Sequence, residues 1–264
     1  MNDTDLKKCP VCKSEKLEEV TKKRLFSSVK ELICKNCGAV FVRDGGMYKL
    51  VKVKDRANPI WIEYGNRFLT AREWNNIANG GMSDEKQRGV DISKWILLVE
   101  KGHVPKIIKD PSPVVLRRNE ELIMSFSGIS YWETRKVRKT TGGYAGPSFR
   151  IAKGVYFRVG KFDATSRSYE ELRRIDTGNL TITNRRFVFT GRFRTIAIPL
   201  GKIVSVKPIE GGVEIAKENR VKSIYFTGIN ETAVDINVDG RRYIEPLSET
   251  VFTYILRNLI KNSA

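Results

Sequence analysis

The sequence has few of the residues that catalytic sites and membrane spans require. Its 264 residues include one histidine, His103, and four cysteines, all within the first forty positions. A single histidine gives any Ser–His or Cys–His scheme only one base, and no nucleophile stands beside it in the sequence. We therefore expect a surface-turn histidine and a protein that is not an enzyme.

Long apolar segments are also missing. The longest apolar run is Trp95–Val99, far below the roughly 20 residues that span a bilayer. The opening residues, MNDTDLKKCP, have no apolar segment of the kind found in secretory signals. A cytoplasmic protein, with any membrane contact peripheral, is the expectation.

Acidic residues are scarce relative to basic ones. The chain has 48 Lys+Arg against 30 Asp+Glu, a net charge of +18, and 41% hydrophobic residues. This hydrophobic content is typical of a folded soluble protein. The charge predicts attraction to an anionic membrane surface, a protein or nucleic acid, unless the surplus merely solvates the surface. No motif indicates a small-molecule substrate.

The cysteines form two C-x2-C pairs, Cys9 with Cys12 and Cys34 with Cys37. This spacing is typical of a four-thiolate zinc site, because each pair can fold into a tight turn that presents both sulfurs to one ion. Disulfides and a redox C-x2-C are the alternatives, and neither suits a cytosolic protein without a βαβ unit. The stretch resembles a zinc ribbon, with a hairpin between the two turns. We predict one structural Zn²⁺.

The next segment has helical patterns. LTAREWNNIANGG carries a capping box, with Thr70 as N-cap and Glu73 three residues later. Leu69, Trp74, Ile77 and Ala78 would form its apolar stripe. DISKWILLVEKG predicts a second helix with Asp91 as its cap and Gly102 as its end.

From Val114 the pattern changes to period two. Seven strand-like segments, separated by turn residues, are followed by a helical segment in which Leu247, Val251, Ile255 and Leu259 share one face. The pattern also predicts a Gly-rich loop, TTGGYAGPS, between two of the strands. Its Gly142, Gly143 and Gly146 would let backbone amides approach a phosphate.

Seven strands followed by one helix is the architecture of pleckstrin-homology-like (PH-like) domains. GNLTITNRRF, IPLGKI and GGVEI, which begin at residues 178, 198 and 211, also resemble the bacterial PH-like, GRAM-like family. The resemblance implies a fold and no defined activity. The sequence thus predicts a mainly β chain with some α. It would comprise a zinc ribbon over 1–54, a short helical connector over 55–110, and a PH-like seven-stranded antiparallel barrel capped by a C-terminal helix over 111–264.

Basic residues gather in two places on the predicted barrel. PH-like domains that bind phosphoinositides use cations near the early loops, so the resemblance favours anion binding by the first cluster. The second cluster consists of Arg185, Arg186, Arg192 and Arg194. Beside it, Asn184 suits a turn position with positive φ, and Arg186 suits hydrogen bonds to turn carbonyls. Arg185 has no such structural role. The candidate anion-binding residues are Arg135, Lys136, Arg138, Lys139, Arg185, Arg186, Arg192 and Arg194. The predicted function is a non-enzymatic zinc-containing adaptor that contacts an anionic membrane or a protein. Nucleic-acid binding through the ribbon and the basic barrel face is the alternative.

Overall fold

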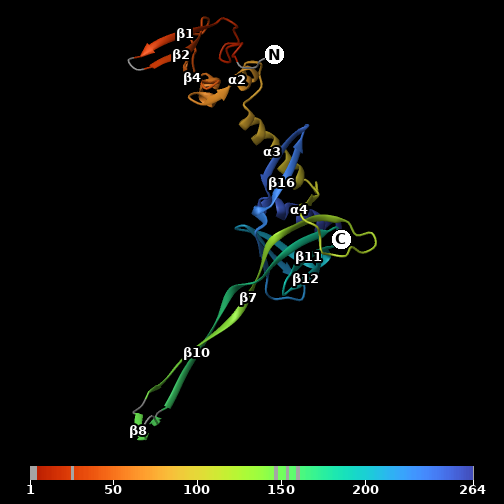
Figure 1. Cartoon of the computed structure of the whole chain (residues 1–264). Helices are drawn as coiled ribbons and strands as arrows, with labels where there is room; N and C mark the ends of the chain where they lie inside the picture. The colour runs from red at the N-terminus through yellow and green to blue at the C-terminus, as the bar shows by residue number, and fades with distance from the viewer. Residues whose placement is uncertain (1–4, 25–26, 146–147, 153–154, 159–160, 264) are drawn as a thin grey trace. The chain divides into compact units, whose positions relative to one another are not determined.

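The structure is a computed structural model that describes residues 5–24, 27–145, 148–152, 155–158 and 161–263. Within these ranges it describes side chains outside 23–28 and 137–168. The fold is mainly β, with antiparallel sheets and a C-terminal helix (Figure 1). Contacts divide it into a first unit, Met1–Ser93, and a second unit, Lys94–Ala264. The boundaries predicted after residues 54 and 110 stay predictions.

The first unit contains a five-stranded antiparallel sheet in the order β1-β2-β3-β4-β5. β1 and β2 form the hairpin predicted between the cysteine pairs, with Leu17 opposite Cys34. One face of the sheet carries the core, where Phe41, Leu50 and Trp74 are fully buried. The elements are β1 (Leu17–Arg24), β2 (Ser27–Cys34), β3 (Val40–Asp44), β4 (Met47–Lys52), α1 (Pro59–Tyr64), β5 (Phe68–Thr70) and α2 (Ala71–Ala78). The next helix, α3 (Asp84–Glu100), begins in the first unit and ends in the second.

α2 confirms the predicted capping box. The Glu73 amide donates to the Thr70 hydroxyl at 3.2 Å, and the Glu73 carboxylate accepts from the Thr70 amide at 2.9 Å. The predicted stripe of α2 is buried. The start predicted for the next helix was wrong, because α3 begins at Asp84 and Asp91 lies inside it. Asp91 is buried there and accepts a hydrogen bond from Gln87, one turn earlier, at 2.8 Å.

The second unit contains a mostly antiparallel sheet in the order β12-β11-β10-β7-β15-β14-β13, with β6 parallel to β7. The elements are β6 (Ile107–Ile108), β7 (Leu122–Ala145), β8 (Ser148–Ala152), β9 (Val155–Arg158), β10 (Lys161–Thr183), β11 (Arg186–Gly191), β12 (Thr195–Pro199), the 3-10 turn η1 (Leu200–Lys202), β13 (Ile203–Ile209), β14 (Gly212–Lys217), β15 (Ile224–Thr227), η2 (Ile229–Glu231), β16 (Ala233–Val238), β17 (Arg241–Pro246) and α4 (Glu249–Ser263).

The prediction of a closed barrel is corrected by the order of pairing. Within the described residues the sheet starts at β12, ends at β13 and does not close. η1 separates these two end strands, and it begins directly after Pro199, which has no amide hydrogen to donate to a neighbouring strand. The chain therefore turns a corner at this point, and β13 starts a new run of pairing with β14.

α4 covers the core of the second unit, as its sequence pattern predicts. Leu247, Val251, Ile255 and Leu259 are all buried, and Phe252 meets Phe126 of β7 edge to face, with ring centroids 6.3 Å apart. The sequence analysis did not predict the hairpin of β16 and β17, which follows β15 in the sequence and precedes α4.

β7 and β10 extend far beyond the sheet as a two-stranded ribbon (Figure 1). β15 pairs with β7 only from Ser130, opposite Thr227, to Glu133, opposite Ile224. β11 pairs with β10 only from Gly178 onward. A bulge at Ile175 interrupts the register where the ribbon leaves the sheet. The predicted Gly-rich loop is thus strand as far as Ala145, with Gly142 opposite Ala164 and Gly143 opposite Asp163; Gly146 lies outside the described residues.

Candidate metal centre and basic clusters

The four cysteines of the first unit lie in one cluster, with all their Sγ atoms within 4.8 Å of one another. The Sγ atoms of Cys9 and Cys37 are 3.7 Å apart. Those of Cys12 and Cys34 are 3.5 Å apart. Four sulfurs about 2.3 Å from a tetrahedral zinc ion are about 3.8 Å from one another, whereas a disulfide joins its sulfurs at about 2.05 Å. The cysteines are free, and their arrangement suits a metal ion.

Both C-x2-C pairs fold into the same turn. The amide of the residue after the second cysteine, Lys13 or Gly38, donates to the carbonyl of the first cysteine, at 2.7 and 2.8 Å. Lys13 and Gly38 both adopt positive φ, 62° and 72°. The amide of each first cysteine then donates to the carbonyl two residues beyond the second, at 2.8 and 2.9 Å. This repeated geometry presents two sulfurs from each turn to a common point.

The environment of the thiols differs between positions. Cys9 and Cys34 are fully buried. Burial raises the pKa of Cys9, and it raises the pKa of Cys37 to about 11. Burial also raises the pKa of Cys12, but hydrogen bonds, led by that from the Asn36 side chain, outweigh it and lower the pKa to about 7. Thiolates crowded this closely repel one another, and a divalent cation supplies the charge that stabilises them together.

α2 and β4 hold the segment that leads into the first turn. The Asn75 side chain of α2 accepts from the Lys7 amide at 2.9 Å and donates to the Asp5 carbonyl at 3.0 Å. The Tyr48 hydroxyl of β4 donates to the Asp5 carboxylate at 3.3 Å. The sequence analysis missed both Asn75 and the turn residue Lys13. An asparagine 66 positions after Cys9 does not stand out in the sequence, and lysine is not a residue type from which positive φ is expected.

Arg186, a candidate anion-binding residue, is held in an internal ion pair. Its Nε donates to Glu120 Oε1 at 2.7 Å and its Nη2 to Glu120 Oε2 at 2.9 Å. Nη2 also donates to the Val115 carbonyl at 2.9 Å. The Glu120 side chain is 0% exposed and that of Arg186 is 15% exposed. Arg186 beside it holds the pKa of Glu120 at about 2, well below its ordinary value of 4.5.

The turn before Arg186 is built by a residue that the sequence interpretation overlooked. The Thr183 hydroxyl accepts from the amides of Arg185 and Arg186, at 3.1 and 3.0 Å, and donates to Glu120 Oε1 at 2.7 Å. Asn184 does not adopt the predicted positive φ. Its side chain instead accepts from the Glu121 amide at 2.9 Å, which ties this turn to the loop before β7.

The remaining arginines of the second cluster are not brought together. Arg185 precedes β11, whereas Arg192 and Arg194 follow its far end; six residues of strand separate these ends by about 20 Å. All three are exposed. The buried Asp176 carboxylate accepts from the amides of Phe193 and Arg194, at 2.7 and 2.8 Å, and so fixes the second turn.

The first cluster, which consists of Arg135, Lys136, Arg138 and Lys139, lies on β7 where this strand pairs with β10. Arg135 lies opposite Glu171, and Lys136 lies opposite Glu170. Arg135 also approaches Glu133 at 3.5 Å. Arg138 and Lys139 belong to β7 by their backbone, and their side chains lie outside those the structure describes. Anion binding by the eight residues of the two clusters stays a prediction.

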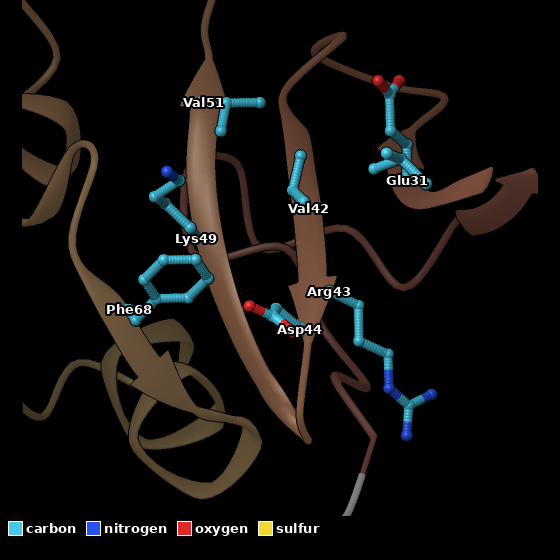
Figure 2. A pocket seen from close by; sticks show the side chains of 8 residues that line it. Glu31, Val42, Arg43, Asp44, Lys49, Val51 and Phe68 are labelled. Carbon is cyan, nitrogen blue, oxygen red and sulfur yellow. The ribbon is translucent and has the colours of Figure 1, made fainter. Parts of the chain in front are cut away.

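A hollow of about 470 Å³ opens on the outer face of the first unit's sheet (Figure 2). Glu31, Val42, Lys49 and Phe68 form one row across four strands. Glu31 forms an ion pair with Lys22 at 2.6 Å. Figure 2 shows Lys49 beside Phe68, and its Nζ lies 4.7 Å from the ring centroid. Glu31 and Lys49, which line the hollow, are therefore each engaged by a neighbouring side chain.

No protein-family model and no curated protein matches the chain. His103 is exposed after the end of α3, where its amide donates to the Leu98 carbonyl at 3.0 Å. Among the described helices, none has the length and apolar character that crossing a membrane requires.

Proposed function

We propose that the chain is a non-enzymatic binding protein whose first unit folds around one structural zinc ion. The observation that carries this proposal is the four-cysteine cluster, in which two equivalent turns direct their sulfurs to one point. Four thiolates complete a tetrahedral shell and leave no open position for a substrate. Cys9, Cys12, Cys34 and Cys37 would hold the ion, and its binding would supply folding free energy to the first unit.

The second unit supports a PH-like assignment through its strand order. A four-stranded run from β7 through β10 and β11 to β12 and a three-stranded run from β13 to β15 meet where β7 pairs with β15, and α4 follows. The hairpin of β16 and β17 is an addition to seven strands and a helix. In this proposal the second unit is the binding module, and its cations contact an anionic partner, either a membrane surface or a protein, with nucleic acid as the alternative.

The two halves of the proposal have separate tests. Full-length chain purified without added metal should contain one zinc per chain by atomic emission, and Cys12→Ser/Cys37→Ser should contain none. For the second half, the chain should float with vesicles containing phosphatidylglycerol, or shift the anisotropy of a labelled nucleic acid, and should ignore vesicles of phosphatidylcholine alone. A chain without zinc would overturn the first half, and a chain that binds no anionic partner would overturn the second.

A further inference from the structure

The ribbon formed by β7 and β10 divides into two parts that differ in charge. The inner ribbon pairs 133–136 with 170–173, and the outer ribbon pairs 137–145 with 161–169. The inner ribbon has three basic and three acidic residues. Each of its cations lies opposite an acid: Arg173 opposite Glu133, Arg135 opposite Glu171, and Lys136 opposite Glu170. The inner ribbon is therefore neutral by itself.

The outer ribbon lacks this compensation. It carries Arg138, Lys139, Lys161 and Arg167 against one acid, Asp163. Its register sets Lys139 opposite Arg167, and like charges directly opposite destabilise a two-stranded sheet. Residues 137–169 comprise both strands of the outer ribbon and the tip, which is the segment 146–160 between them. They include seven basic residues and one acidic residue, so an eighth of the chain's length carries a third of its net charge. An anion supplied from outside would offset this unbalanced charge.

The placement of these cations suits a linear polyanion. Nine paired positions at about 3.4 Å per residue give the outer ribbon a length of about 30 Å, close to one turn of B-DNA at about 34 Å. The cations occur near both ends of this length. In between, Thr140–Gly143 lie opposite Asp163–Ser166, and the sequence has only residue types with short side chains at these positions. The major groove of B-DNA admits a two-stranded β-ribbon.

We propose that the outer ribbon is an arm that binds duplex DNA, and that the placement of Arg138, Lys139 and Arg167 together on its paired strands supplies the cations for this binding. The inference rests on the proposed function, since it names the anionic partner of the second unit. Four of the seven cations lie along the paired strands and three between them. The four favour a duplex over a lipid surface, because a bilayer would meet an arm of this kind chiefly at its tip. Phosphate contacts dominate the affinity, so the arm binds duplexes of any sequence.

The test uses the full-length zinc-loaded chain and a labelled duplex of about 24 base pairs, with fluorescence anisotropy measured at several salt concentrations around 150 mM. Binding should weaken steeply as salt rises. Arg138→Gln/Lys139→Gln/Arg167→Gln should weaken binding about 100-fold at 150 mM salt and reduce the slope of log K against log salt by about 3. The matched control removes three exposed cations of the second unit outside the ribbon, Lys101→Gln/Arg118→Gln/Lys207→Gln, and should change affinity by only a few-fold.

Equal losses in the triple variant and in its control would overturn the arm and leave only a diffuse attraction by net charge. Binding to phosphatidylglycerol vesicles without binding to the duplex would also overturn it, while the proposed binding function would stand. Binding to neither would overturn the arm and, of the partners in the proposed function, would leave only an acidic protein. If the triple variant fails to fold, the same titration is made with a chain in which Asn-Gly replaces residues 138–168; this chain must lose duplex binding if the inference holds.

Discussion

At the scale of single residues, the two neighbouring arginines 185 and 186 have different roles. Arg186 is fixed by a two-pronged ion pair to a fully buried carboxylate, whereas Arg185 is exposed. Arg186→Gln leaves the Glu120 charge buried without its partner, so we expect it to lower the free energy of unfolding by about 3–5 kcal/mol. Arg185→Gln should change it by less than about 0.5 kcal/mol. Urea unfolding of both variants compares them, and equal effects would contradict this account.

The same ion pair predicts a dependence on pH. The Arg186 guanidinium lowers the pKa of Glu120 from 4.5 to about 2, so the folded protein binds this proton less readily than the unfolded chain. The stabilisation is therefore fully present above pH 4.5 and is lost as pH falls toward 2. The stability difference between the native chain and Glu120→Gln should shrink across this window. A difference that stays constant would show that the carboxylate charge contributes nothing.

At the scale of elements, the ribbon is separable from the core that supports it. Among the side chains of β7 and β10 that the structure describes, the buried ones lie at Ile123–Tyr131 and beyond Arg174, within the sheet. Val137 and Tyr169 lie directly opposite each other on the two strands. A two-residue Asn-Gly turn can connect two strands at such a pair. Replacing residues 138–168 by Asn-Gly should therefore leave the melting temperature of the second unit within a few degrees. A large loss measured by circular dichroism would mean that the ribbon contributes to the fold.

Local patterns of the sequence predict several elements correctly, because their causes are local. The capping box of Thr70 and Glu73, the apolar face of α4 and the hairpin between the cysteine pairs all depend on residues close in sequence. The ribbon was missed because Thr140–Gly143 has the composition of a loop, and only pairing with a distant strand makes it β structure. The partner of Arg186 was missed because Glu120 lies 66 residues away.

At the scale of the whole molecule, the two units should respond differently to metal removal. Zinc binding to four thiolates contributes on the order of 10 kcal/mol to a small module, and the cysteines lie only in the first unit. A strong zinc chelator should therefore unfold the first unit and leave the second folded. Limited proteolysis should then cleave within residues 5–93 and spare the sheet of the second unit. Simultaneous loss of both units would contradict separate stabilisation.

The central claim, a zinc ion held by four thiolates, is tested most directly by the metal content of the purified chain. Atomic emission on full-length protein, together with a titration of reactive thiols before and after chelation, measures both ion and ligands. We predict one zinc per chain, with four thiols protected until the metal is removed. A chain that contains no zinc, or whose thiols are paired as disulfides, would contradict the account.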